Sequence, residues 1–345
     1  MTDPMISIVI PCRNEENFIG MCLESIISND YPKDHLEVLV VDGVSEDRTR
    51  DIVKTYVEKC SYIKLLNNPK KITPCAMNIG IKEALGSYII ILGSHSKIKN
   101  NFIKLNVRSI EENKADCVGG VTITLPSNET VIAQSIALAL SHPFGVGNAY
   151  FRVGSNKPRY VDTVPFGCYK KELFSKIGYF DEDLARNQDD EFNLRLIKNG
   201  GKILLAPDIV SYYHARDSIS KIWQMFFQYG YFKPLVAKKV GGILTWRQMM
   251  PALFVGSLLI SLLLSFIFKP FFYLFLLISS LYCLVNLGIS FHIAMKKGWK
   301  HFLMLPIVFA TVHFSYGIGY LKGIWDFLVL KKNRRKKIED VPLTR

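Results

Sequence analysis

The chain has 345 residues, of which 49% are hydrophobic, and it carries a formal net charge of +13. Its length and apolar content suffice for a large packed core, which excludes a wholly disordered protein. The basic residues are spread along the chain apart from one cluster at 331–337 that follows an apolar stretch, so we expect a membrane surface and no nucleic acid as the anionic partner.

The first 125 residues alternate short apolar runs with helical patterns. The apolar runs lie at residues 6–11, 36–41, 62–66, 87–92 and 116–125, and the helical patterns lie near residues 17–28, 48–59, 73–84 and 100–112. Apolar strands separated by helices are typical of an α/β fold with a mostly parallel sheet covered on both faces. No basic segment precedes the first run, which therefore reads as a strand and not as a signal peptide.

Residues 130–245 differ in composition from the region before them. A glycine- and proline-bearing stretch precedes a helix-rich segment that ends in an aromatic and basic run at about residues 218–240. Such a run suits a helix lying in the membrane interface, and it suits a buried aromatic core helix equally well. We expect a catalytic domain over residues 1–240 with this helix at its end.

Three apolar tracts follow, at about residues 250–268, 270–291 and 302–330. The first two have the length of about 18 residues that crossing the bilayer requires, which predicts a transmembrane hairpin turning at Lys269 and Pro270. The third contains Pro306 and several glycines, so we expect it to break into two short helices or a re-entrant pair. That arrangement keeps the basic tail, residues 331–345, in the cytosol, as the positive-inside rule requires.

The seven cysteines are an odd number without a C-x-x-C pair, which suits neither a disulfide framework nor a zinc ribbon. We therefore expect a catalytic domain in the reducing cytosol, attached to the cell membrane by several membrane segments.

Polar side chains follow the first two predicted strands. Asn14 and Glu15 follow the first strand, and Asp42 follows the second. In a parallel sheet the ligand binds beyond the carboxyl ends of the strands, where polar groups can bind a nucleobase or ribose. Helix capping explains Ser45 and Asp47, but it does not explain an acidic residue directly after LEVLVV.

The segments IVIPCRNEENFI and VVDGVSEDRTRDIV resemble the nucleotide-binding half of glycosyltransferase family 2, closest to the branch that contains succinoglycan-type glucosyltransferases. The resemblance covers about residues 5–235 and implies a glycosyltransferase A-type fold and a nucleoside diphosphate sugar, with UDP expected as the nucleotide. An arginine common in the family is Met77 here, which weakens one expected phosphate contact. The residues expected to contact the nucleotide sugar are Pro11, Asn14, Glu15, Asp42, Asn78 and Ser94.

The family's metal motif, D-x-D or D-x-H, should follow the run at 87–92, where the sequence reads Gly93, Ser94 and His95. The first carboxylate is absent. Mg²⁺ and Mn²⁺ prefer oxygen ligands, and Mn²⁺ also accepts imidazole. His95 and His214 are therefore candidate ligands, with diphosphate oxygens completing the site. Two alternatives stay open: Arg216 neutralises the diphosphate without a metal, or His95 only makes a hydrogen bond in a loop.

Acidic residues begin an amphipathic helix in the run ARNQDDEFNLRLIKNGG. The helix dipole favours acidic residues in a first turn whatever the function. Aligned with the family's E-D-x-x-L motif, Asp189 matches the general base that takes a proton from the acceptor hydroxyl, and the adjacent Asp190 is its rival. One base and a direct displacement imply an inverting enzyme.

The resemblance and the apolar tail together favour transfer of one sugar to a polyprenyl-linked or other membrane-proximal glycan acceptor in surface polysaccharide assembly. A processive synthase is less favoured because Q-x-x-R-W does not follow the predicted base and the spans are too few for a pore. A non-catalytic sugar- or lipid-binding relative is the other alternative, since Gly93 replaces a metal ligand, but Asp189 argues against it.

Overall fold

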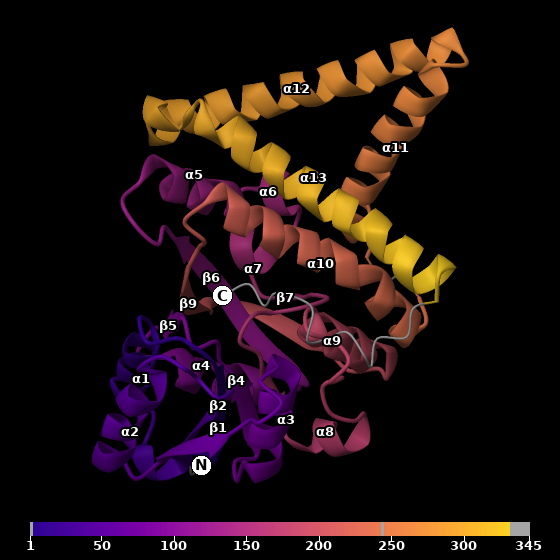
Figure 1. Ribbon diagram of the computed structural model, residues 1–345. Coiled ribbons are helices and arrows are strands. Elements are labelled where there is room, and N and C mark those ends of the chain that lie inside the picture. The colour runs from indigo at the N-terminus through magenta and orange to yellow at the C-terminus, as the bar shows by residue number, and fades with distance from the viewer. Residues whose placement is uncertain (1–2, 243–244, 332–345) are drawn as a thin grey trace. The chain divides into compact units, whose positions relative to one another are not determined.

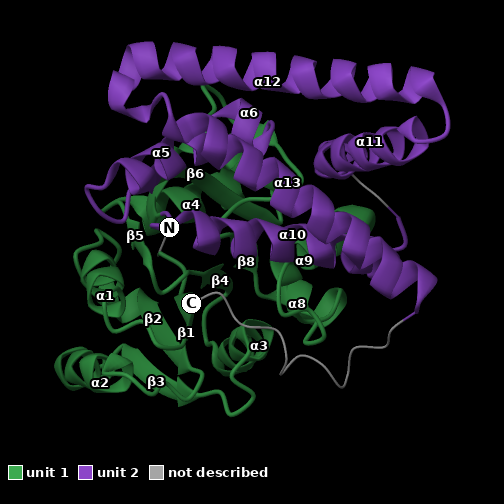
Figure 2. Ribbon diagram, turned by 45° about the horizontal axis from the view of Figure 1, so that its top comes forward, with its two compact units in different colours: residues 1–123, 150–214, 345 green, residues 124–149, 215–344 purple. Residues whose placement is uncertain are grey.

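The computed structural model describes residues 3–242 and 245–331, which fall into two compact units (Figures 1 and 2). Among the described residues, unit 1 comprises 3–123 and 150–214, and unit 2 comprises 124–149 and 215–331. The division therefore differs from the expected boundary at residue 240, because residues 124–149 and 215–240 group with the C-terminal helices. The expected basic tail lies, from residue 332 onward, outside the described residues.

Unit 1 is built on a sheet that has nine strands among the residues described. The strand order is β3-β2-β1-β4-β8-β6-β9-β5, and β7 pairs with β9. The strands are β1 (Ile6–Cys12), β2 (Leu36–Asp42), β3 (Ile63–Asn67), β4 (Tyr88–Ile91), β5 (Ser96–Ile98), β6 (Cys117–Leu125), β7 (Arg159–Tyr160), β8 (Cys168–Lys170) and β9 (Ile203–His214). The helices are α1 (Ile19–Ile27), α2 (Thr49–Lys59), α3 (Thr73–Glu83), α4 (Phe102–Glu112), α7 (Tyr150–Val153), α8 (Glu172–Lys176) and α9 (Gln188–Lys198), with a 3₁₀ turn at Lys33–His35.

The predicted α/β fold is confirmed, and every strand and helix expected before residue 125 is present within a few residues of its predicted bounds. Strands β3, β2, β1 and β4 are parallel neighbours, whereas β8 joins β4 and β6 in antiparallel pairs. The long strand β9 and the short β5, β7 and β8 were not predicted.

Side chains alternate between two hydrophobic clusters along the parallel strands. Ile8 belongs to the cluster under α1, α2 and α4, and its neighbour Val9 belongs to the cluster under α3 and α9. Helix α3 approaches β1 closely at Gly80, where an added Cβ would lie 2.3 Å from Val9 Cγ1. Any larger residue at position 80 would push α3 away from the sheet, so glycine fixes this contact.

Unit 2 is helical in its described part. Its helices are α5 (Val131–Leu140), α6 (Pro143–Val146), α10 (Ile219–Val240), α11 (Met250–Ser265), α12 (Lys269–Lys297) and α13 (Met304–Ile324), with 3₁₀ turns at Trp246–Gln248 and Trp299–His301 and a π-helical turn at Trp325–Val329. Helix α10 is the expected aromatic helix, and one of its faces packs along α13. The chain turns between α11 and α12, and Pro270 lies in the first turn of α12, as expected.

The expected break in the third apolar tract is wrong, because α13 runs without interruption from Met304 to Ile324. Pro306 lies in the first turn, where its missing N–H has no partner to lose. The glycines serve contact with neighbouring helices: an added Cβ would lie 2.2 Å from Phe227 O at Gly319 and 2.2 Å from Tyr231 O at Gly323. Close packing by α10 therefore explains the glycines that the sequence alone made look like helix breakers.

Two of the described helical segments are long and apolar enough to cross a membrane, Lys269–Lys297 and Met304–Val329. Only 11% of the apolar window of α12 is buried, against 56% for the second segment. Helix α11, at 16 residues, is shorter than the expected tract.

Candidate functional site

The carboxyl ends of β1, β2 and β3 meet at one edge of the sheet. Cys12 pairs with Asp42, and Asp42 pairs with Asn67, so the last residues of all three strands are aligned. Burial, together with the nearby carboxylates of Glu15 and Asp42, raises the pKa of the Cys12 thiol. Cys12 is therefore a neutral part of the floor of this edge and not a nucleophile.

Asp42 is completely buried, and three hydrogen bonds hold its carboxylate. Ser45 donates to it from its hydroxyl at 2.5 Å and from its backbone N–H at 3.2 Å, and Arg50 donates from Nη1 at 2.6 Å. Arg50 also donates to Asn67 Oδ1 at 2.9 Å. A carboxylate has about four acceptor positions, so these three bonds use most of the capacity of Asp42.

The loop after β1 is tied to the loop after β2 by a set of short hydrogen bonds. Asn14, at φ +53°, donates its N–H to Ser45 Oγ at 2.9 Å and accepts the N–H of Glu46 at 2.9 Å. The N–H of Glu15 donates to Thr49 Oγ1 at 2.7 Å. These bonds place Asn14, Glu15 and Asp42 together, as the sequence predicted.

Val44, in the same pair of loops, has φ +57° and is exposed. Positive φ is strained for a β-branched residue, and such strain concentrates at functional sites. The strained loop supports the assignment of this edge as the ligand site.

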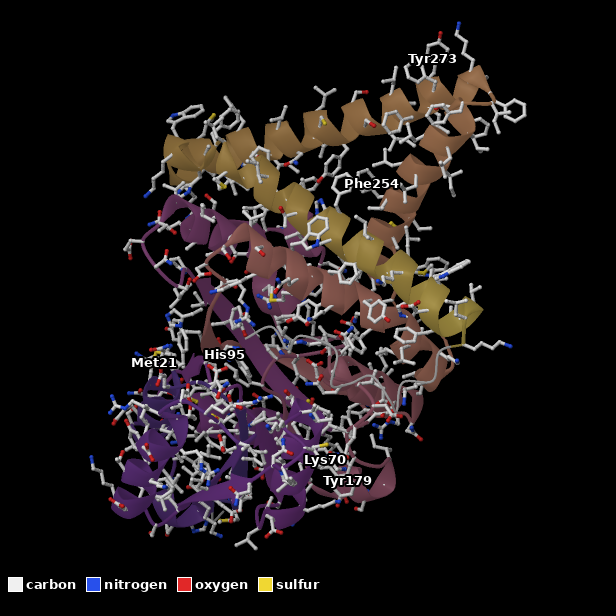
Figure 3. The ribbon with its side chains drawn as sticks, viewed as in Figure 1. Met21, Lys70, His95, Tyr179, Phe254 and Tyr273 are labelled. Atoms are coloured by element: carbon white, nitrogen blue, oxygen red, sulfur yellow. The ribbon has the colours of Figure 1, made fainter. Side chains whose placement is uncertain are left out.

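His95 follows β4 at the same edge (Figure 3). Its Nδ1 lies 3.4 Å from Glu15 Oε1, so the imidazole and a predicted nucleotide ligand are neighbours. At Gly93, where the D-x-D or D-x-H motif would begin, an added Cβ would lie 3.1 Å from the ring of Phe166. The aromatic ring therefore takes up space that the missing side chain would need.

The antiparallel pair of β5 and β9 brings the second predicted histidine to His95. Ser96 pairs with Tyr213, and continuing this register by one residue sets His95 opposite His214. The ring of Tyr213 meets the His95 ring edge-on at 5.5 Å, and His214 lies 6.1 Å from the ring of Phe18.

Sequence reasoning missed Arg152 in this region. The guanidinium carbon of Arg152 lies 5.3 Å from the centre of the Tyr213 ring, which is the ring that touches His95. Among the described residues Arg152 has no carboxylate partner. The only signal in the sequence was an arginine between aromatic residues in a glycine-bearing stretch, and its approach to Tyr213 depends on a long-range contact.

The protein side chains alone do not fit a metal site. Within residues 3–242 and 245–331, no group of three His, Cys, Asp or Glu side chains is close enough to hold an ion. His95 lies beside Glu15, so a cation there would depend on oxygens that a diphosphate brings.

Asp189 and Asp190 lie in the first turn of α9, as predicted. The residue before the helix, Asn187, is in the left-handed conformation with φ +59°. Burial raises the pKa of the Tyr169 phenol well above its usual value, and the negative charge of Asp189 adds to the rise. Asp189 thus lies near Tyr169 of β8, the strand next to β4.

The other predicted residues lie in different surroundings. Pro11 is paired with β2 beyond the end of the β4 ladder, and Ser94 is buried in the turn after β4. Asn78 is bonded to the segment before α9, and not to the residues at the strand ends. Arg216 follows β9 by two residues and belongs to unit 2.

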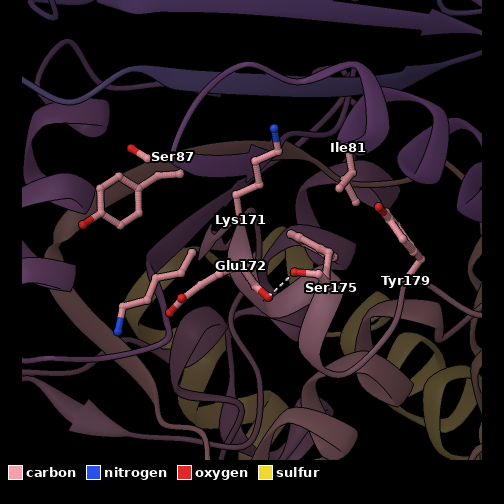
Figure 4. A pocket seen from close by; sticks show the side chains of 9 residues that line it. Ile81, Ser87, Lys171, Glu172, Ser175 and Tyr179 are labelled. Atoms are coloured by element: carbon pink, nitrogen blue, oxygen red, sulfur yellow. Dashed lines mark hydrogen bonds between the residues drawn. The ribbon is translucent and has the colours of Figure 1, made fainter.

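A pocket lies at the opposite edge of the sheet, beside Tyr88 at the amino end of β4 (Figure 4). Lys171 donates to Ala84 O, and Lys170 pairs with Asp116 at 3.2 Å, so its cations are engaged. The pocket contains none of the predicted site residues.

Comparison with known proteins agrees with this geometry. The sequence model of glycosyl transferase family 2 matches residues 7–178. The dolichyl N-acetyl-alpha-D-glucosaminyl phosphate 3-beta-D-2,3-diacetamido-2,3-dideoxy-beta-D-glucuronosyltransferase of Methanococcus voltae is 32% identical over 328 residues, which cover 92% of this chain and 97% of that protein. The succinoglycan biosynthesis protein ExoA of Rhizobium meliloti is 23% identical, with 95% and 97% covered.

Two solved structures share the fold. The mannosyltransferase PcManGT from Pyrobaculum calidifontis, in complex with GDP-Man and Mn²⁺, has a TM-score of 0.60 at 17% identity. The superposition covers 94% of this chain and 88% of the mannosyltransferase chain. S. aureus TarS 1–349, in complex with UDP-GlcNAc, has a TM-score of 0.50 at 17% identity, with 96% and 93% covered.

Proposed function

Because the chain belongs to glycosyltransferase family 2, we propose that it moves a sugar from a nucleoside diphosphate sugar to a lipid-linked or other membrane-proximal glycan acceptor, with inversion at the anomeric carbon. The observation that carries this proposal is the buried Asp42 carboxylate at the edge where three parallel strands end. Burying an ion is costly unless it is hydrogen-bonded, and Ser45 and Arg50 supply these bonds to Asp42 at the end of β2.

The nucleoside half of the donor is bound by the loops after β1 and β2. Asp42 and Glu15 accept hydrogen bonds from the ribose or base, and Asn14 fixes the two loops to one another. UDP is the nucleotide that we propose, because S. aureus TarS 1–349, which shares the fold, is solved in complex with UDP-GlcNAc.

Asp189 acts as the general base. It accepts the proton of the acceptor hydroxyl while that oxygen bonds to the anomeric carbon and the bond from this carbon to the diphosphate oxygen breaks. The electron pair leaves with the nucleoside diphosphate, and the sugar is inverted. Asp190, the next residue in the first turn of α9, is the rival base.

The departing diphosphate needs positive charge. Arg152, beside Tyr213, and Arg216, just after β9, are the side chains that we propose for this purpose. Mn²⁺ or Mg²⁺, held by His95 and His214 together with phosphate oxygens, would add charge at the same place. The steps assigned to Asp42, Glu15 and Asp189 do not depend on it.

The acceptor is membrane-bound in this proposal. The name of the M. voltae relative gives a dolichyl-linked sugar phosphate as its acceptor, and this chain has two helices with the length and apolarity of membrane spans. A polyprenyl-linked glycan at the bilayer surface is the corresponding acceptor here. We place unit 1 in the cytosol, where nucleotide sugars are available, and unit 2 in the cell membrane.

The direct test is a donor screen. The full chain, solubilised in detergent, is incubated with UDP- and GDP-sugars and a membrane lipid extract, with and without Mn²⁺, and products are identified by mass spectrometry. We expect one donor to give a lipid product heavier by one sugar residue. Nucleotide binding without transfer from any donor would reject the proposal in favour of a sugar-binding role.

A further inference from the structure

The segment 177–182 between α8 and α9, named the strap, is held by Asn78 of α3. The side-chain amide of Asn78 donates to Phe180 O at 2.9 Å and to Glu182 Oε1 at 3.1 Å, and its oxygen accepts the N–H of Phe180 at 3.0 Å. Asn78 is 4% exposed. Both of its N–H donors are used by the strap, so Asn78 has no donor left for a ligand.

Glu182 of the strap is also joined to the loop that follows β3. Lys70 Nζ lies 2.7 Å from Glu182 Oε2. The hydrogen bond from Lys70, reinforced by those from Asn78 and Cys75 and opposed in part by burial, lowers the pKa of Glu182 to about 2. The carboxylate is therefore ionised at neutral pH and spans the gap between Lys70 and Asn78.

The opposite side of the strap is fastened to α9. Arg195 of α9 donates to the carbonyl oxygens of Ile177 and Tyr179, the second at 2.8 Å, and pairs with Glu191 at 2.7 Å. The ring of Phe180 packs 4.7 Å from the ring of Phe192, which is also on α9. Figure 3 labels Tyr179, which belongs to the strap, and Lys70, which belongs to the loop after β3.

We propose that Lys70, Asn78 and Glu182 form a clasp that sets the position of α9, and with it the carboxylate of Asp189, relative to the nucleotide-binding edge. All three are positioning residues, and the inference rests on the proposed role of Asp189 as the base. The clasp works because α3 is itself fixed on β1 at Gly80. The rigid path runs from β1 through α3 and the strap to the first turn of α9.

The clasp also gives a role to the ion pair between Lys70 and Glu182, although both side chains are partly exposed. Lys70 is 67% exposed and Glu182 38%, so solvent and salt weaken their attraction. Little stability is therefore expected from the pair. The pair instead holds the strap close to the loop after β3. Its position matters because a displacement of about 1 Å at a base can cost about a hundredfold in rate.

Charge-reversal variants test the clasp. Lys70→Glu, Glu182→Lys and the double exchange are made in the full chain, and each is assayed for transfer, for UDP affinity by calorimetry, and for hydrogen exchange of residues 177–192. We expect each single variant to lower kcat by about tenfold or more, with UDP affinity within about twofold and with faster exchange. The double exchange restores the ion pair but not the bond from Asn78, because lysine at position 182 has no acceptor, so it should recover part of kcat and part of the slow exchange.

The matched control is Lys176→Glu on α8. Lys176 pairs with Glu172 at 3.0 Å and is 61% exposed, but this pair stays within one helix. It should leave kcat and exchange of the strap unchanged. A double exchange that stays as slow as the singles, or a loss of UDP affinity as large as the loss of kcat, would overturn the clasp.

Hydrogen exchange separates this inference from the proposed function. If the unaltered chain transfers no sugar, the proposed glycosyltransferase activity is rejected. The clasp is then tested by hydrogen exchange alone. Unchanged exchange of residues 177–192 in both single variants, and in Asn78→Asp as a third, would overturn it.

Discussion

Carboxylates define the site at the scale of single residues. Asp42 is buried and held by Ser45 and Arg50, whereas Asp189 lies in a first helical turn beside Tyr169. The helix start favours the ionised form of Asp189, which is the form that can accept a proton. We propose Asp42 for ligand binding and Asp189 for the base.

Asp189→Asn should lower kcat by about 10²- to 10⁴-fold, the usual contribution of a general base, because the amide cannot take the acceptor proton. UDP affinity should stay within about twofold, since the carboxylate acts only on the acceptor. Steady-state kinetics with the donor identified in the screen gives kcat, and calorimetry gives the affinity.

Asp190→Asn is the matched control, one residue along the same turn. A larger loss of kcat in this variant than in Asp189→Asn would transfer the role of base to Asp190.

Glu182 gives a pH prediction. Its folded pKa, about 2, lies below its ordinary value of 4.5, chiefly because of Lys70. A carboxyl whose pKa is lowered on folding stabilises the protein above its unfolded pKa, and this stabilisation is lost as pH falls toward the folded pKa. The Tm of the unaltered chain should exceed that of Glu182→Gln by a constant amount from pH 6 to 8, and the difference should shrink below about pH 4.5.

A Tm difference that stays constant from pH 7 to well below pH 4.5, or one that grows on acidification, would contradict this prediction.

The sequence predicted the positions of those candidate residues that local order fixes. Asn14, Glu15 and Asp42 directly follow parallel strands, so their meeting follows from the strand pattern. Asn78 faces the strap, and Arg152 faces Tyr213, through contacts between residues more than 60 positions apart. No local pattern carries that information.

At the scale of elements, backbone contact between α10 and α13 depends on glycine. Gly323→Leu should destabilise unit 2 by about 1–3 kcal/mol, because its Cβ would lie 2.2 Å from Tyr231 O and the helices would have to separate. The loss is measured as a lower Tm of the purified chain in detergent by circular dichroism.

Gly288→Leu on α12 is the control, since an added Cβ there meets nothing within 4 Å. Equal losses of Tm at positions 288 and 323 would show that helix contact is not the cause.

The sequence did not predict elements whose formation depends on contacts with distant parts of the chain. Strand β9 contains Pro207 and Asp208, which argue against a central strand in sequence, yet it lies between β6 and β5. Helix α13 contains glycines that argue against a helix, yet each one admits a neighbouring backbone. Alternating strands and long helices are readable locally, whereas these exceptions depend on partners brought from elsewhere in the chain.

At the scale of the whole molecule, two described helical segments have the length and apolarity of membrane spans. Helix α12 exposes leucine and aromatic side chains along its length, including Leu277, Leu281 and Leu284. A helix of this kind is stable when lipid covers it. Unit 1 carries no comparable described helix.

Trypsin should distinguish the two sides of the membrane. In intact spheroplasts we expect unit 1 to remain uncut, because we place it in the cytosol, and in inverted vesicles we expect it to be cleaved. Immunoblotting with an antibody against unit 1 reads the result, and a cytosolic protein enclosed in the spheroplasts reports their integrity. Cleavage of unit 1 in intact spheroplasts would reverse the proposed orientation.

The contact between Gly93 and Phe166 also has an evolutionary consequence. One nucleotide change converts a glycine codon into an aspartate or a glutamate codon, so a carboxylate at position 93 is a single mutation away. The Cβ at position 93 would nevertheless lie 3.1 Å from the Phe166 ring, which would have to move to admit it. A carboxylate at position 93 therefore requires a small displacement of the Phe166 ring or a smaller residue at position 166.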